Sequence, residues 1–264
     1  MSDAQLYNSS PLFRIRGELV ASVEDEQGEV SVIDNKIYRL MSFDRVFEQS
    51  KMQKSRPELP VHKYISAMLM AAALTPLDKV LLLGLGGGCL VRALHAHDPA
   101  IAIDVVELRQ AVVDVAKSYF CLPLSNDIRY QVDDAALFIA NALKGHYSLI
   151  CSDLYSASAA VPLQSTRTFL RHCAQALQPG GWLVLNHQTA PDEDSAFSAA
   201  LTSLFSTVLY CSTPSGNVVI YASREHCPSP LSELRDRMKK SGALFQSDFS
   251  LLAQKVYRWP GSRP

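Results

Sequence analysis

The chain has 264 residues, with 25 basic and 26 acidic side chains and a formal net charge of −1. Charged residues make up 19% of it, which argues against a disordered chain, and a nucleic-acid binder would show a basic excess that is missing here. No run approaches the roughly 18–20 apolar residues of a membrane span. The first residues, MSDAQLYNSSP, lack the basic start and apolar core of a signal peptide. We therefore expect a cytoplasmic globular protein with no nucleic-acid or membrane partner.

The six cysteines are widely scattered, none of them in a CxxC pair, and several lie inside apolar runs. This distribution indicates reduced thiols that act as small hydrophobic side chains. His95 and His97 stand two positions apart near the expected end of a helix, where their side chains do not face the same way. We therefore expect neither a disulfide framework nor a metal site.

Residues 1–60 are expected to form a small antiparallel β-sheet region. Polar and apolar residues alternate between positions 12 and 49, and turn-forming residues stand at Gln27-Gly28 and Asp34-Asn35. A charged connector with two prolines, residues 56–60, ends this region.

Residues 61–225 show a different pattern, in which mostly apolar strands alternate with helices. This order is typical of a parallel sheet that is covered by helices on both faces. We expect strands at Val80–Gly84, Ile101–Glu107, Ile128–Val132, Tyr147–Ser152 and Trp182–Asn186, and helices at His62–Leu74, Gly88–His97, Gln110–Phe120, Ala135–Leu143, Leu163–Leu177 and Ser195–Leu204.

The sheet is expected to end in an antiparallel hairpin. Val208–Cys211 and Asn217–Ala222 are apolar, and the turn-rich sequence STPSG separates them. Residues 226–264 are expected to form one helix and a short tail. The predicted fold class is therefore α/β, with a mostly parallel sheet that carries an antiparallel C-terminal edge hairpin and follows a small N-terminal antiparallel sheet.

A glycine-rich turn, GLGGG at residues 84–88, follows the first strand of the parallel series. Glycine is needed where φ is positive or where a ligand lies against bare backbone, and the next helix begins with free N–H groups. Because ligands of such sheets bind at the carboxyl ends of the strands, this turn predicts a nucleotide or nucleoside site. Cys89 departs from the third glycine or alanine of the dinucleotide fingerprint.

Acidic residues follow or end three further strands. Glu107 can accept hydrogen bonds from both hydroxyl groups of a ribose, in NAD and in S-adenosylmethionine (SAM) alike. A carboxylate of the pair Asp133-Asp134 can accept from an adenine amine, and it can also cap the helix that follows. Asp153 is expected to face the crevice in which a reacting group would sit.

Four stretches of the sequence, and a later fifth one that is common among methyltransferases, carry a resemblance that covers roughly residues 12–225. The chain is similar to the class I SAM-dependent methyltransferases and, more closely, resembles the spermidine synthase (polyamine aminopropyltransferase) family. This resemblance implies a Rossmann-like class I methyltransferase fold, SAM or decarboxylated SAM as the donor, a small-molecule acceptor and a homodimer. The stretches are VLLLGLGGG (80–88), VVELRQAVVDVAKSYF (105–120), YQVDDAALFI (130–139), YSLICSDLYS (147–156) and LQPGGWLVLN (177–186).

The resemblance also implies roles for individual residues. Asp153 matches the first acid of the family's D-x-x-D and would orient or deprotonate the acceptor amine. His187, which follows the last parallel strand on the same edge of the sheet, is added as an acceptor contact from its position alone. The implied donor contacts are Gln49, Gly84, Gly86, Gly88, Glu107, Asp133 and Asp134, and the implied acceptor contacts are Tyr64 and Tyr155.

Three acids of the family pattern are missing. Gly87 stands where G-G-G-D-G-G has its acid, Ser66 replaces the acid two positions after the helix tyrosine, and Ser156 replaces the second acid of D-x-x-D. A charge-assisted hydrogen bond contributes about 1.5–3 kcal/mol, so these losses predict weaker polyamine recognition. Because SAM carries a carboxylate that decarboxylated SAM lacks, Gly87 favours SAM as the donor. Asp192-Glu193-Asp194 can supply other acids, although acids are also typical of a helix start.

Two functional hypotheses stay open. The first is an enzyme that moves a methyl or aminopropyl group from SAM or decarboxylated SAM to a small amine acceptor. The second is a non-catalytic nucleoside-binding or interaction module with the same fold. An NAD oxidoreductase is disfavoured by Cys89, by the edge hairpin and by the lack of a second substrate domain.

Overall fold

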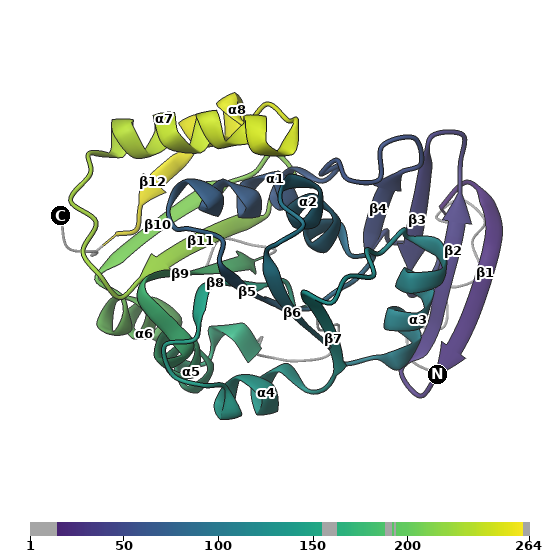
Figure 1. The fold of residues 1–264 in the computed structure, drawn as a ribbon, viewed down its shortest axis with the longest axis horizontal. Coiled ribbons are helices and arrows are strands. Elements are labelled where there is room, and N and C mark those ends of the chain that lie inside the picture. Colours follow the sequence, from purple (N-terminus) through teal and green to yellow (C-terminus); the bar gives the residue numbers. More distant parts are fainter. Residues whose placement is uncertain (1–14, 155–162, 188–191, 193, 261–264) are drawn as a thin grey trace.

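The computed structural model describes residues 15–154, 163–187, 192 and 194–260. Two sheets make up the molecule, and the chain passes from the smaller sheet A into the larger sheet B (Figure 1). Sheet A is antiparallel, with the strand order β1-β2-β3-β4, and so confirms the expected N-terminal sheet. Its fourth strand was not predicted. The strands are β1 (Glu18–Asp25), β2 (Gly28–Asp34), β3 (Tyr38–Ser42) and β4 (Ser50–Gln53).

Sheet B has eight strands in the order β12-β10-β11-β9-β8-β5-β6-β7. The five strands from β9 to β7 are parallel, which confirms the Rossmann-like α/β fold. The parallel strands are β5 (Lys79–Leu83), β6 (Ala102–Glu107), β7 (Ile128–Val132), β8 (Tyr147–Ser152) and β9 (Leu177–His187).

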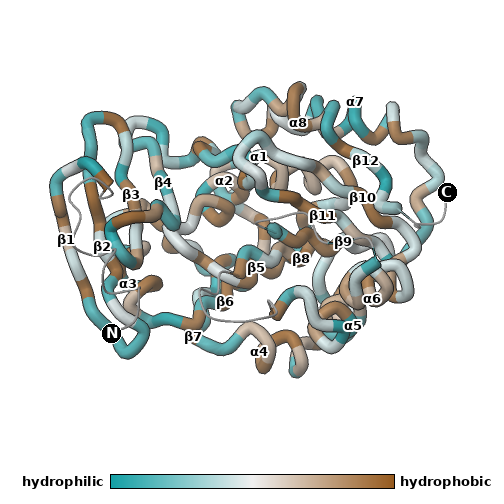
Figure 2. The backbone as a smooth tube through the Cα atoms, turned by 180° about the vertical axis from the view of Figure 1, so that it is seen from behind, coloured by the Kyte–Doolittle hydropathy of each residue, from teal (hydrophilic) through white to brown (hydrophobic). Residues whose placement is uncertain are grey.

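Helices cover both faces of sheet B, and Figure 1 shows α4, α5 and α6 together on one of them. Figure 2 shows hydrophobic residues along the central strands and hydrophilic ones along the outermost helix, α7. The first expected helix is shorter than predicted, because its last turn tightens into the 3₁₀ helix η4 (Met70–Ala73). The helices are α1 (Lys63–Leu69), α2 (Cys89–His97), α3 (Gln110–Tyr119), α4 (Ala135–Asn141), α5 (Arg167–Ala176) and α6 (Ala196–Leu204).

The C-terminal part of sheet B differs from the expectation in two ways. The hairpin β10 (Thr207–Ser212) and β11 (Val218–Ser223) forms, but it is not the edge, because the short β12 (Val256–Arg258) pairs with β10. The prediction of one helix and a tail after residue 225 is also wrong. A three-residue strand is too short for alternation to reveal, and only its pairing with β10 defines it. The C-terminal helices are α7 (Leu231–Ser241), η6 (Gly242–Phe245) and α8 (Ser250–Gln254).

Arg109 joins sheet A to the helix that covers sheet B. It stands at the start of α3, and its guanidinium donates to both carboxylate oxygens of Asp25 (3.0 and 2.7 Å) and to the Gly28 carbonyl (2.7 Å). The Phe43 ring lies 4.8 Å from the guanidinium carbon. These contacts fix the β1–β2 turn against the end of β6.

Within the ranges that the structure describes, no helix is both long and apolar enough to cross a membrane.

Asp104 is the centre of a buried ion-pair cluster on β6. Its carboxylate accepts from Arg129 (2.7 and 3.1 Å) and from the Tyr147 hydroxyl (3.0 Å), and the Lys79 ammonium lies 3.1 Å away. Burial raises the pKa of Asp104, but these partners outweigh it and leave the pKa below its ordinary value. The ionised form therefore stabilises the fold above the unfolded pKa, and this stability is lost as the pH falls through the folded pKa.

Replacing Asp104 by Asn, which keeps the shape but removes the charge, is expected to cost about 1–3 kcal/mol of unfolding free energy at neutral pH. Urea unfolding measures this cost, which should shrink as the pH is lowered into the acid range. Asp127→Asn, at an exposed acid beside the start of β7, is the matched control and should cost little. A cost that is equal at all pH values would contradict the ion-pair account.

Candidate active site at the strand ends

The glycine turn leads from β5 into α2 and packs against the end of β8. Gly84 has φ +92°, and a Cβ at this position would lie 2.5 Å from the Asp153 carbonyl oxygen. No residue with a side chain fits there without moving the backbone. The turn therefore lies directly beside Asp153, which brings two of the predicted groups together.

Glu107 ties the glycine turn to the neighbouring strand β6. One carboxylate oxygen accepts from the Leu85 amide (3.0 Å), and the other accepts from the Arg109 amide (3.1 Å). A carboxylate can accept about four hydrogen bonds, so both oxygens still have room for ribose hydroxyl groups. Leu108 and Val132, at the ends of β6 and β7, are 53% and 44% exposed. They give this edge an apolar surface on which a flat base could lie.

Asp133 and Asp134 follow β7, next to Glu107. The Asp133 amide donates to the Glu107 carbonyl (3.1 Å), and the Asp133 side chain is exposed. Asp134 caps α4, because one of its oxygens accepts from the amides of Ala136 (2.6 Å) and Leu137 (3.1 Å). The capping role is thus present, and adenine recognition by either carboxylate stays a prediction.

Asp153 lies at the end of β8, where it is half-buried. Its Oδ1 accepts from the Asn186 side-chain amide (2.7 Å), and the Tyr64 hydroxyl on α1 lies near the carboxylate. Burial raises the pKa of Asp153 although Asn186 and Tyr64 both lower it, so the net pKa is above its ordinary value. Burial and the nearby Asp153 together raise the pKa of Tyr64 well above its ordinary value. Tyr64 is therefore a neutral donor, and Asp153 is placed to take up a proton.

The position of the missing loop acid is filled by other residues. The Gly87 amide donates to the Ser50 hydroxyl (2.8 Å), and a Cβ at Gly87 would lie 3.0 Å from both the Ser50 Cβ and the Phe120 ring. Ser50 follows the predicted donor contact Gln49, and β4 begins there. The N-terminal sheet therefore closes directly over the glycine turn, and an acid at position 87 would force its neighbours apart.

Arg92 supports the same turn from within. Arg92 is 5% exposed, and its guanidinium donates to the carbonyls of Gly87, Phe120 (2.7 Å) and Pro57 (2.7 Å). The sequence analysis missed Arg92, and it assigned no contact to Ser50. Arg92 could have been found from the sequence, because it is a basic residue on the otherwise apolar face of α2. The contact of Ser50 could not, because it depends on how sheet A docks.

The other predicted acceptor contacts, and the two positions on α1 and after β8 where family acids are missing, divide into three groups. Ser66 is 4% exposed on α1, so its side chain is not available to an acceptor. Tyr155 and Ser156 lie outside the described residues. His187 packs its ring against Phe197 of α6, on the face of β9 opposite to Asn186, because neighbouring strand residues alternate.

His187 is also a poor candidate for a base in this structure. Burial lowers its pKa to about 4, and its Nε2 atom has no partner among the described residues. The structure thus brings the glycine turn, Glu107, Asp133, Tyr64 and Asp153 to one edge of the sheet, while His187 points to the other face.

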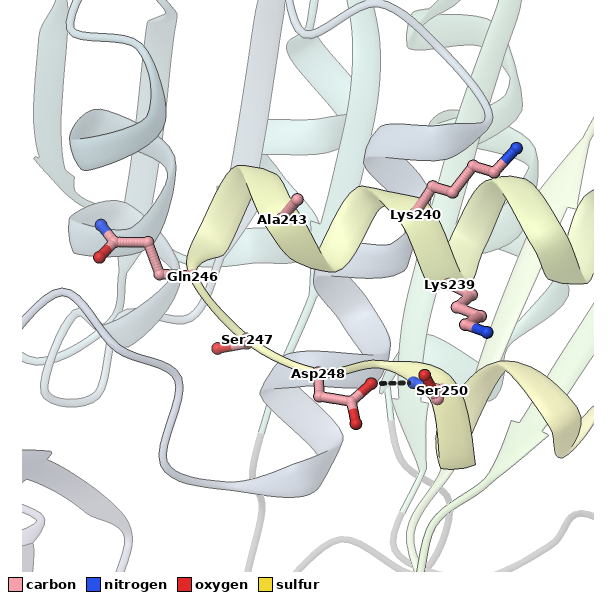
Figure 3. A pocket seen from close by; sticks show the side chains of 7 residues that line it. All are labelled: Lys239, Lys240, Ala243, Gln246, Ser247, Asp248 and Ser250. Carbon is pink, nitrogen blue, oxygen red and sulfur yellow. Dashed lines mark hydrogen bonds between the residues drawn. The ribbon is translucent and has the colours of Figure 1, made fainter.

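An open surface pocket of about 710 Å³ lies elsewhere (Figure 3). Its residues come from the C-terminal helices and their connecting turn, and Lys239 and Lys240 extend their ammonium groups away from the helix axis. None of the strand-end residues described above lines this pocket. We therefore assign no part of the strand-end chemistry to it.

Comparison with known protein families identifies the family of this chain. The model of the spermine/spermidine synthase domain matches residues 58–221, which is more than half of the chain. The chain belongs to this family. The match begins at the connector before α1 and ends in β11, so it spans Tyr64, the glycine turn, Glu107 and Asp153.

Individual relatives of this spermidine synthase-family protein are polyamine aminopropyltransferases. The one from Vibrio vulnificus is 28% identical over 211 residues, which are 76% of this chain and 70% of the relative. The one from Lachnoclostridium phytofermentans is 27% identical over 234 residues, which are 83% of this chain and 81% of the relative. This relationship supports a transferase.

Solved structures agree with the fold. A probable spermidine synthase from Corynebacterium glutamicum matches with a TM-score of 0.73 at 18% identity, over 93% of this chain and 95% of that one. Human methyltransferase-like protein 13 in complex with SAH matches with a TM-score of 0.62 at 22% identity, over 70% of this chain and 93% of that one. At these identities the likeness shows the fold alone.

Proposed function

We propose that the protein transfers an alkyl group from SAM, in preference to decarboxylated SAM, to a small amine acceptor. The observation that carries the choice of donor is the packing at Gly87. The family pattern has an acid there, whereas here Ser50 and Phe120 occupy the space beside a bare glycine. A site without that carboxylate does not repel the carboxylate that SAM carries.

The nucleoside half of the donor fits the edge formed by β5, β6 and β7. Glu107 has lone pairs left for ribose, Asp133 is exposed next to it, and Leu108 offers apolar surface for the base. The sulfonium end would then reach the glycine turn and Asp153, because Gly84 packs on the Asp153 backbone.

The chemistry follows from what Asp153 and Tyr64 can do. The donor supplies its own leaving group: a nitrogen–carbon bond forms, the carbon–sulfur bond breaks, and sulfur keeps the electron pair as a neutral thioether. An alkyl amine with a pKa near 10.4 is almost entirely protonated at neutral pH, so the site must take up a proton. Asp153 accepts that proton, and the Tyr64 hydroxyl holds the carboxylate in place.

The products distinguish the possible reactions. Purified protein is incubated with SAM or with decarboxylated SAM and a panel of mono- and diamines, and the nucleoside product is identified by mass spectrometry. We expect S-adenosylhomocysteine, the product of methyl transfer, from SAM. Methylthioadenosine from decarboxylated SAM would instead indicate aminopropyl transfer and contradict the donor assignment.

Two variants of Gly87 test the donor assignment directly. Gly87→Asp adds a side chain and a charge, whereas Gly87→Ala adds only the Cβ that meets Ser50 and Phe120 at 3.0 Å. We expect the ratio of SAM affinity to decarboxylated SAM affinity to fall roughly tenfold in Gly87→Asp relative to Gly87→Ala. Isothermal titration calorimetry measures the affinity of each variant for each donor. An equal ratio in the two variants would show that position 87 does not face the amino-acid end of the donor.

A non-catalytic nucleoside-binding module is the second candidate function, and the buried Ser66 favours it because an acceptor acid is lost there. Tight nucleoside binding with no alkylated acceptor would support this candidate.

The homodimer that the family resemblance implies also stays a prediction. Light scattering of the purified protein tests it by measuring the molar mass in solution.

A further inference from the structure

Two asparagines that the sequence analysis did not single out connect a hairpin turn to the Asp153 carboxylate. The Ser215 hydroxyl donates to Asn217 Oδ1 (3.0 Å), Asn217 Nδ2 donates to Asn186 Oδ1 (3.1 Å), and Asn186 Nδ2 donates to Asp153 Oδ1 (2.7 Å). We call Asn217 and Asn186 the amide relay. It runs from the β10–β11 turn through the end of β9 to the end of β8.

Every hydrogen bond of the amide relay points the same way. Each side-chain amide accepts on its oxygen from the turn side and donates from its nitrogen toward Asp153. A flipped Asn186 would place its oxygen against the Asp153 carboxylate and its NH₂ group against the NH₂ group of Asn217, and both contacts are repulsive. The direction of Asn186 is therefore set from both ends.

The backbone at Asn186 is held by a side chain outside the amide relay. Gln164 is 3% exposed, and its side chain donates to the Asn186 carbonyl (2.5 Å) and accepts from the Ser152 hydroxyl (2.8 Å). A change in the side chain of Asn217 therefore leaves the strand end in place and acts on the Asn186 amide.

We propose that Asn217, acting through Asn186, is a positioning residue that keeps the Asp153 carboxylate ionised and oriented toward the acceptor. Asn217 makes this contribution without a hydrogen bond to Asp153. The use of Asp153 in the reaction rests on the proposed function, but its ionisation and orientation do not. Hydrogen bonds to the charged form oppose the burial that raises the pKa of this carboxyl.

The other titratable groups that face Asp153 do not compete with it in the acid range. Tyr64 on α1, Cys89 at the start of α2 and Cys151 on β8 all have pKa values that burial raises. They stay uncharged at neutral and acid pH. Among the described residues around it, Asp153 is therefore the group whose charge the amide relay controls.

The test measures the pKa of Asp153 in the free protein by ¹³C NMR of aspartate carboxyl groups, with Asp153→Asn to assign the resonance. We expect Asn217→Ala to move the Asp153 titration to higher pH, because the Asn186 amide loses its anchor. We expect Asn217→Asp to move it further, because a carboxylate at position 217 attracts the Asn186 NH₂ group and turns its oxygen toward Asp153. Asn141→Ala, at an exposed asparagine on α4, is the matched control and should not move it.

Thermal unfolding first shows that each variant is folded, and Asn217→Ser replaces an Asn217 variant that is not. An unchanged Asp153 titration in the Asn217 variants, with a shift in Asn186→Ala, would overturn the relay and leave Asn186 acting alone. No shift in any variant would overturn it entirely. Calorimetric titration of the same samples with SAM separates the two proposals. If the Asn217 variants shift the Asp153 titration but the protein does not bind SAM, the proposed function alone is refuted.

Discussion

Asp153→Asn is expected to lower turnover by a factor of about 10²–10⁴ while SAM binding is retained. Asn matches Asp in shape and keeps the place of the side chain between Asn186 and Tyr64, but it cannot take up the amine proton. The rate of S-adenosylhomocysteine formation with the best acceptor of the panel measures the loss, and calorimetry measures the binding. The expected separation of turnover from binding would distinguish an enzyme from a nucleoside-binding module.

The pH dependence of activity in the wild-type protein tests the same role of Asp153. The pKa of Asp153 is raised above its ordinary value, and the base must be ionised to accept a proton. Activity should therefore fall as the pH drops through that raised pKa, and this acid limb should be absent from the residual activity of Asp153→Asn. Asp114→Asn, at an exposed acid on α3, is the matched control and should keep both rate and pH profile. A fully active Asp153→Asn would exclude the proposed role.

Gly84→Ala is expected to have the largest effect on stability, with a loss of about 3 kcal/mol or more of unfolding free energy. Two effects add at this position: alanine is strained at φ +92°, and its Cβ would lie 2.5 Å from the Asp153 carbonyl oxygen. Because the clash is with backbone, relief requires the ends of β5 and β8 to separate. That separation also moves Asp153, so nucleoside binding should weaken together with stability.

Gly216 provides a matched control for the strain alone. Its φ is +93°, nearly the same as that of Gly84, but a Cβ there would meet nothing within 4 Å. Gly216→Ala should therefore cost only the conformational penalty, about 1–2 kcal/mol. Urea unfolding measures the loss of unfolding free energy in both variants. The difference between the two losses is the cost of the clash with the Asp153 backbone. Equal losses would contradict the close packing of the glycine turn on β8.

The elements that the sequence predicted well are those that carry their own local signal. The five parallel strands and their helices follow from apolar runs, and the glycine turn and Glu107 follow from the position of each residue at a strand end. The same reasoning could not find β12, because three residues are too few for a pattern.

The residues that sequence analysis missed act through contacts between distant segments. Ser50 reaches the glycine turn only because sheet A docks on it, across 37 positions of the chain. Asn186 and Asn217 meet because β11 pairs antiparallel with β9, a pairing that strand prediction alone does not define. His187 was assigned to the site from its place at the strand end, but alternation along β9 turns it toward Phe197.

The central claim is that a SAM-type donor binds at the glycine turn and that the bare Gly87 selects SAM. The most direct measurement is isothermal titration calorimetry of the wild-type protein with SAM and with decarboxylated SAM, side by side. We predict that SAM binds more tightly than decarboxylated SAM. Tighter binding of decarboxylated SAM would contradict the choice of donor, and binding of neither would contradict the nucleoside site itself.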